Sequence, residues 1–198
     1  MKVAKGFEVG EDVVRVLDAF KLDHAVLAGH SVAGEELTVL GAPKSSRIAA
    51  LVYLDAAWDR TYSAPKGPTG AEDCAGKMGI ASQPKTVDAR FDPAQAIRNN
   101  VQKPDYAQIH IPALAFYAAP RSWEELVPGA PALAPEKRAC AEQMVAGFTR
   151  TRKHMEEEFQ ADVLGSRVVD LPGGGHYVFR TNEADVLSGM RSFLESLP

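Results

Sequence analysis

The chain has 198 residues, of which 22 are Lys or Arg and 26 are Asp or Glu, so its formal net charge is −4 with histidine neutral. This length predicts one globular domain, and 45% hydrophobic with 24% charged residues is close to the average for soluble proteins. Because the mild negative charge is accompanied by no basic stripe, the composition argues against a nucleic-acid partner.

The first half of the chain alternates between helices and strands. Apolar residues recur at helical spacing before the first strand, and the second helix carries carboxylates in its first turn, where the helix dipole favours them. The second strand is a continuous apolar run, which is typical of a strand covered on both faces. Helices are predicted over 13–20 and 31–41, and strands over 24–29 and 48–54.

The regular alternation is interrupted by the segment 58–103, which is rich in Pro, Gly, Lys, Asp and Gln. We interpret it as a lid or cap insertion of short helices over a core formed by 1–57 and 104–198. Alternating strands and helices predict an α/β fold, with a mostly parallel sheet covered by helices on both faces. In the second part of the core, strands are predicted over 111–117 and 167–171, and helices over 136–162 and 185–197.

The strongest functional signal is the motif Gly29-His-Ser-Val-Ala-Gly34 at a predicted strand-to-helix junction. A sharp turn here would lift Ser31 above the carboxyl edge of the sheet, and small flanking residues allow such a turn. The Val32 N–H, at the start of a helix, is then a natural donor to an oxyanion. The motif alone leaves open the alternative that Ser31 is a helix N-cap, with Glu35 near the capping-box position. Ala33 departs from the usual pattern, which has glycine at that place.

A serine nucleophile needs a base, and the chain has five histidines. Only His176 lies past the carboxyl end of a predicted strand, in a glycine-rich loop from which it could face Ser31. The His30 side chain points to the opposite face of its strand from Ser31 and cannot easily reach the serine oxygen. The others stand at the amino ends of strands or among charges within a helix: His24, His110 and His154.

The third residue of a catalytic triad is a carboxylate that fixes the imidazole tautomer and stabilises the imidazolium. Asp55 ends the second predicted strand at the same edge as Ser31, and it gives the chain order Ser, Asp, His. Asp59 lies a few residues further into the loop, and Glu124 and Glu125 follow the third strand at a distance. These three carboxylates are the weaker candidates, and a cap or loop charge is the other interpretation of Asp55.

These residues resemble the α/β-hydrolase fold, and within it the serine esterase and lipase branch. The resemblance runs from about residue 13 to the C-terminus. It implies a serine hydrolase in which 58–103 is the family's lid. Serine at position 31 disfavours the family's branches that use an aspartate nucleophile. The resemblance rests on the motifs Gly29-His-Ser-Val-Ala-Gly34, Leu51-Val-Tyr-Leu-Asp55 and Pro172-Gly-Gly-Gly-His176.

The chain differs from the common family pattern at two places. The acid usually follows the strand before the long helix, but 118–122 contains no acid, whereas Asp55 matches a minority that takes the acid one strand earlier. The family also has several strands before the nucleophile strand, and only about 23 residues precede it here. We therefore expect a fold that lacks these strands, and in which 24–29 is an edge that can pair with a second copy. Losing one oxyanion donor typically costs about 10²–10³ in turnover, which would impair activity.

No other chemistry has a motif in the sequence. A GxxxxGK[ST] loop and an HExxH motif are lacking, and Gly173–Gly175 lacks GxGxxG spacing, so neither a metal nor an organic cofactor is expected. No apolar run is long enough to span a membrane, and 1–10 has no apolar signal core, so we expect a cytoplasmic protein without a membrane partner. Cys74 and Cys140 are too far apart for a CxxC motif, and their redox state stays open.

The sequence therefore predicts a serine hydrolase that cleaves a small-molecule ester or related acyl bond. In this hypothesis Ser31 forms the acyl-enzyme, His176 is the base, Asp55 orients His176 and Val32 donates to the oxyanion. The competing hypothesis is a non-catalytic, hydrolase-like domain that binds a small apolar ligand or another chain through its exposed first strand.

Overall fold

The structure is a computed structural model that describes residues 10–42, 46–62, 74, 102–126 and 133–198. Among these residues lies a four-stranded sheet in the order β1-β2-β3-β4, and all neighbouring strands are parallel. Each strand lies within two residues of where the apolar pattern predicted it, so the predicted parallel sheet is confirmed. The strands are β1 (Ala25–His30), β2 (Ile48–Leu54), β3 (Ala113–Ala119) and β4 (Arg167–Pro172).

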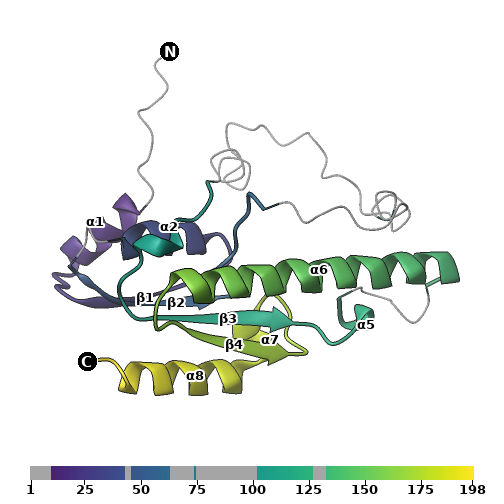
Figure 1. Ribbon diagram of the computed structural model, residues 1–198. Helices are drawn as coiled ribbons and strands as arrows, with labels where there is room; N and C mark the ends of the chain where they lie inside the picture. Colours follow the sequence, from purple (N-terminus) through teal and green to yellow (C-terminus); the bar gives the residue numbers. More distant parts are fainter. Residues whose placement is uncertain (1–9, 43–45, 63–73, 75–101, 127–132) are drawn as a thin grey trace, which may run out of the picture.

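Helices cover both faces of this sheet, as the sequence predicted (Figure 1). The first two helices and α6 (Pro135–Asp162) lie on one side, and α8 (Glu183–Glu195) lies on the other. None of the helices in the described part of the chain combines the length and apolar character that a membrane crossing requires. The helices are α1 (Glu11–Ala19), α2 (Ala33–Gly41), α5 (Trp123–Leu126), α6 (Pro135–Asp162), α7 (Val178–Thr181) and α8 (Glu183–Glu195), with a 3₁₀ turn at Tyr106–Gln108.

The sheet has two apolar cores because side chains along a strand alternate between its faces. On β2, Leu51 and Tyr53 belong to the core beneath α1, α2 and α6, whereas Ala50 and Val52 belong to the core over α7 and α8. All four side chains are completely buried. This two-sided burial is the physical reason that β2 reads as an uninterrupted apolar run in the sequence.

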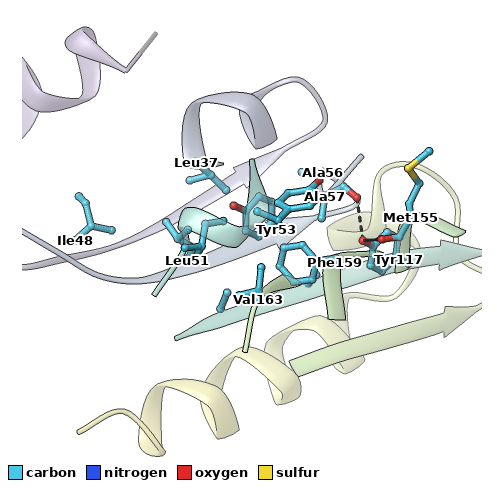
Figure 2. Close-up of a cluster of buried hydrophobic side chains, with 14 of the residues drawn as sticks. Leu37, Ile48, Leu51, Tyr53, Ala56, Ala57, Tyr117, Met155, Phe159 and Val163 are labelled. Atoms are coloured by element: carbon cyan, nitrogen blue, oxygen red, sulfur yellow. Dashed lines mark hydrogen bonds between the residues drawn. The ribbon is translucent and has the colours of Figure 1, made fainter. Parts of the chain in front are cut away.

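Aromatic packing fixes the long helix α6 on the sheet (Figure 2). Phe159 is fully buried, and its ring meets those of Tyr53 and Tyr106 edge to face at 5.2 and 5.1 Å between centroids. Met155, one turn earlier, is buried with it, while Met144 near the other end of the helix is 38% exposed. The C-terminal half of α6 therefore packs into the core, and its N-terminal half extends beyond the sheet.

Strand β1 forms one edge of the sheet within the described residues, because it pairs only with β2. Most of its residues are only half-buried, and Gly29 alone is fully buried. This agrees with the edge position expected for 24–29. The predicted lid falls mostly outside the described residues, which include only 58–62, 74 and 102–103 of it.

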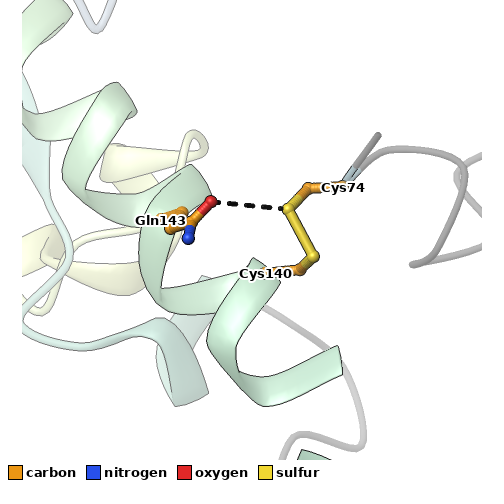
Figure 3. Close-up of a disulfide and its surroundings, with 3 residues drawn as sticks. All are labelled: Cys74, Cys140 and Gln143. Carbon is orange, nitrogen blue, oxygen red and sulfur yellow. Dashed lines mark hydrogen bonds between the residues drawn. A yellow bond between two sulfur atoms is a disulfide. The ribbon is translucent and has the colours of Figure 1, made fainter. Parts of the chain in front are cut away.

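Cys74 and Cys140 form a disulfide, with their Cα atoms 5.1 Å apart (Figure 3). The bond ties position 74 to the N-terminal half of α6, where the side-chain oxygen of Gln143 lies 3.7 Å from Cys74 Sγ. Disulfides persist mainly in oxidising compartments, and the cytoplasm, where the sequence predicted this protein to be, is a reducing one. That location stays a prediction.

Candidate active site

Ser31 occupies a strained turn between β1 and α2. Its φ is +57°, in the left-handed region that non-glycine residues rarely adopt. Helix α2 begins at Ala33 with Val32 as its N-cap and no side-chain capping bond, so Ser31 does not cap the helix. The Ser31 Oγ lies instead 3.0 Å from Nε2 of His176. The turn thus directs the hydroxyl to the carboxyl edge of the sheet.

Close packing explains which positions of the motif have to be small. A Cβ at Gly34 would lie 1.9 Å from the carbonyl oxygen of Ala56, which is backbone and cannot move aside. A Cβ at Gly29 would lie 2.9 Å from the Cβ of Ala33. The alanine that departs from the usual pattern therefore fits because Gly29, opposite it, leaves the space.

Asp55 stands at the end of β2 in a second left-handed conformation, with φ +48°. Aspartate is among the non-glycine residues that tolerate this region. Its side chain is buried, and its two oxygens have separate partners. Oδ2 lies 2.7 Å from Nδ1 of His176, and Oδ1 accepts the Ala118 N–H at 3.0 Å. The carboxylate is therefore held between β3 and the loop after β4.

His176 completes a chain of hydrogen bonds across the carboxyl ends of three strands. A tight loop after β4 places it, and Gly174 is required there because a Cβ would lie 2.7 Å from the Leu171 carbonyl oxygen. Nδ1 faces Asp55 and Nε2 faces Ser31, while 48% of the side chain remains exposed. Because the imidazole is partly exposed, it can transfer a proton between Ser31 and a reactant that enters from the solvent.

His30 contacts the loop that carries His176. Its Nε2–H donates to the backbone carbonyl of His176 at 2.9 Å, and the two imidazole rings lie 4.5 Å apart. Tyr177 and Phe179 surround the His30 ring at 5.1 and 5.2 Å. The sequence analysis excluded His30 as the catalytic base. The position of His30 next to Ser31 was the one signal in the sequence that could have indicated this supporting contact.

A cavity of about 280 Å³ opens beside these groups. Trp58 and Phe148, whose rings are 5.6 Å apart, form an apolar wall, and Arg60 supplies a cation. The sequence did not single out Trp58 or Arg60, although both follow Asp55 within five residues. The lining residues are Ser31, Asp55, Trp58, Arg60, Ala118, Pro120, Phe148, Gly174, Gly175 and His176.

The loop after Asp55 is anchored to the core by Tyr117. Its phenol donates to the Ala57 carbonyl at 2.9 Å, the contact drawn in Figure 2. Burial, followed by the nearby carboxylates of Glu156 and Asp55, raises the pKa of Tyr117 well above its usual range. The hydroxyl therefore stays protonated and keeps donating, which holds the wall of the cavity in place.

The other carboxylates considered from the sequence have different partners. Asp59 Oδ1 accepts the backbone N–H and the hydroxyl of Thr61 at 2.8 and 2.5 Å. Glu125 accepts the backbone N–H of Arg121, and Glu124 is exposed. Only Asp55 among them contacts His176 within the described residues. These residues contain no group of three or more His, Cys, Asp or Glu side chains that could hold a metal ion.

In sequence, the chain matches no family model and no curated protein. Its structure resembles a probable hydrolytic enzyme from Pseudomonas aeruginosa PAO1, with a TM-score of 0.56 and 12% identity over 93% of this chain and 68% of that one. It also resembles an alpha/beta hydrolase enzyme from a lagoon-sediment metagenome, with a TM-score of 0.55 and 12% identity over 94% and 68%. An esterase from Rhodococcus sp. gives a TM-score of 0.51 and 19% identity over 96% and 72%. Together with the parallel, doubly covered sheet, these likenesses show that the chain has the α/β-hydrolase fold.

Proposed function

We propose that the protein is a hydrolase that cleaves an ester or related acyl bond through an acyl-enzyme on Ser31. The observation that carries the proposal is the continuous chain of contacts from Ser31 Oγ to His176 Nε2 at 3.0 Å and from His176 Nδ1 to Asp55 Oδ2 at 2.7 Å. Nucleophile, base and orienting carboxylate within hydrogen-bond reach are what acyl transfer by serine requires. The fold, which the chain shares with structures described as a hydrolytic enzyme and an esterase, supports it.

In the first step, His176 Nε2 removes the proton of Ser31 as Oγ bonds to the acyl carbon. The carbonyl oxygen becomes negative and accepts the N–H of Val32, at the start of α2, where the helix dipole favours negative charge. The bond from carbon to the alcohol oxygen then breaks, and the alcohol leaves with the proton from His176. Asp55 stabilises the transient imidazolium.

In the second step, water replaces the alcohol. His176 takes a proton from water as its oxygen bonds to the acyl carbon, and the second tetrahedral intermediate again places its negative oxygen at Val32. The bond to Ser31 Oγ breaks, and the serine recovers its proton from His176. The acid is released and the enzyme is regenerated, so no co-reactant besides water is needed.

A fluorophosphonate probe tests the proposal directly. We expect one probe molecule to bond to Ser31 of the native protein, because only an activated serine beside an oxyanion donor attacks such a probe quickly. Mass spectrometry of the labelled peptide locates the site. Ser192→Ala, which removes an exposed serine on α8, is the matched control and should be labelled like the wild type.

A folded protein that the probe leaves unlabelled would contradict the proposal. It would favour instead a non-catalytic domain that binds a ligand or another chain. The feature that supports this second candidate is the half-buried strand β1, whose outer backbone groups have no neighbouring strand within the described residues. Pairing of β1 with a second copy of the chain belongs to this second candidate.

His30 should act as a positioning residue. We expect His30→Ala to lower kcat for a short 4-nitrophenyl ester about 3- to 10-fold, because it removes one hydrogen bond to the backbone of His176. The KM should change little, since His30 does not line the cavity. The rate of fluorophosphonate labelling should fall in parallel. His30→Gln retains a donor of similar reach and should recover part of the rate, whereas equal losses in both variants would argue for packing alone.

A further inference from the structure

The cavity beside Ser31 combines a small volume with an aromatic wall, and Arg60 is the one Lys or Arg side chain among its described lining residues. We infer that the substrate is a short acyl ester that carries a carboxylate at its far end, and that Arg60 binds this carboxylate. The inference rests on the proposed function, because it assigns a substrate class to the same site.

Arg60 has an open binding face. Its Nε lies 3.3 Å from Glu35 Oε1, and no other ion pair or hydrogen bond of Arg60 is found within the described residues. The side chain is 30% exposed and lines the same cavity as Ser31 and His176. The two Nη groups are therefore available, and their planar fork matches the two oxygens of a carboxylate.

The remaining lining sets the size and character of the rest of the substrate. A volume of about 280 Å³ is just below the usual range for ligand pockets, roughly 300–1,000 Å³. Trp58, Phe148 and Pro120 add apolar surface to the same cavity as Arg60 and Ser31. A short methylene chain between the scissile ester and the carboxylate would bury its apolar surface there.

The competing explanation is that Arg60 serves only to neutralise Glu35. Burial raises the pKa of Glu35 and the positive charge of Arg60 lowers it, so the carboxylate depends on this partner. The Oε1 atom of Glu35 is itself buried and has no hydrogen bond. Glu35 does not line the cavity, however, so a ligand in the cavity contacts the Arg60 guanidinium and not the Glu35 carboxylate. An experiment has to separate the two roles.

Two methyl esters of equal length provide that experiment: monomethyl adipate, which carries a carboxylate, and methyl 5-carbamoylpentanoate, its neutral amide counterpart. We expect the wild type to prefer monomethyl adipate by at least about tenfold in kcat/KM. Arg60→Gln should lower this ratio about 10- to 100-fold, mainly through KM, because it removes a charge-assisted interaction with the bound ester. Arg60→Lys should lie between them, since it keeps the charge without the fork. Product acid is quantified by liquid chromatography.

Matched variants separate binding from neutralisation. Arg15→Gln removes an exposed arginine that is also paired with a glutamate, Glu11 at 3.1 Å, and should leave the ratio unchanged. Glu35→Gln should keep or increase the preference for the carboxylate. If Arg60 only neutralises Glu35, Arg60→Gln would weaken both esters equally, and the double variant Glu35→Gln/Arg60→Gln would restore both. That result would overturn the inference.

The outcomes also separate this inference from the proposed function. A wild type that is labelled by the fluorophosphonate but shows no preference for monomethyl adipate overturns the substrate class alone. A wild type that is not labelled and hydrolyses neither ester overturns both. Where Arg60→Gln fails to fold, the wild-type ratio still tests the substrate class, and Arg60→Lys tests whether Arg60 binds the carboxylate.

Discussion

Ser31→Ala should lower kcat for a short 4-nitrophenyl ester by roughly 10⁴- to 10⁶-fold, because loss of the nucleophile removes the acyl-enzyme route altogether. In the proposed mechanism Ser31 Oγ bonds to the acyl group, and it lies 3.0 Å from Nε2 of His176. Alanine is no more strained than serine at the observed φ of +57°, so the variant should fold. Release of nitrophenolate, followed by absorbance, measures the effect.

The same assay needs a control for hydrolysis by surface groups. Ser192→Ala removes a hydroxyl of the same kind from α8, away from the cavity lining, and should hydrolyse the ester at the wild-type rate. Thermal unfolding of both variants shows whether the fold is kept. Equal rates for the wild type and Ser31→Ala would show that Ser31 does not carry the reaction, whatever the rate.

The second large effect is expected at Asp55. Asp55→Asn should lower kcat about 10³- to 10⁴-fold, because an amide that donates to Nδ1 of His176 stabilises the wrong imidazole tautomer and no longer supports the imidazolium. Asparagine tolerates the left-handed conformation at φ +48° and can still accept the Ala118 N–H. The substitution therefore tests charge and tautomer without adding backbone strain. Steady-state kinetics on the 4-nitrophenyl ester provide the measurement.

Asp59→Asn is the matched control for this substitution. Asp59 is also buried and four residues further along the same loop, but it accepts hydrogen bonds from Thr61, which an asparagine oxygen retains. We expect its kcat to stay within about threefold of the wild type. If Asp59→Asn were the damaging change and Asp55→Asn were tolerated, the assignment of the acid would have to move to Asp59.

Much of the fold could be predicted because burial on both sides of a parallel sheet leaves a strong sequence pattern. The run 48–54 is apolar throughout since Leu51 and Tyr53 fill one core while Ala50 and Val52 fill the other. The bounds of helix α6 were predicted to within one residue, but the sequence did not show that its apolar side chains divide between the core and the cavity. Met155 and Phe159 are in the core, whereas Phe148 lines the cavity.

The candidate triad could be located from the sequence because parallel strands bring their carboxyl ends to one edge. Ser31, Asp55 and His176 each follow a predicted strand, and that alone places them together. The sequence could only rank Asp55 above Asp59 as the acid, since the two residues lie only four positions apart at the end of the same strand. The hydrogen bonds of the two carboxylates point to Asp55, although its role remains part of the proposal.

By itself, the sequence determined the parallel sheet, the four longer helices and the sheet edge at which the candidate residues gather, because these follow from local periodicity and strand direction; the short helices α5 and α7 were not predicted. Only the tertiary structure decided that Arg60 shares a cavity with Ser31, that Ala33 fits beside Gly29, and that Cys74 pairs with Cys140. Such contacts join residues that are far apart or irregularly spaced along the chain. No periodic pattern in the sequence predicts these contacts, because they depend on how the loops pack in the folded protein.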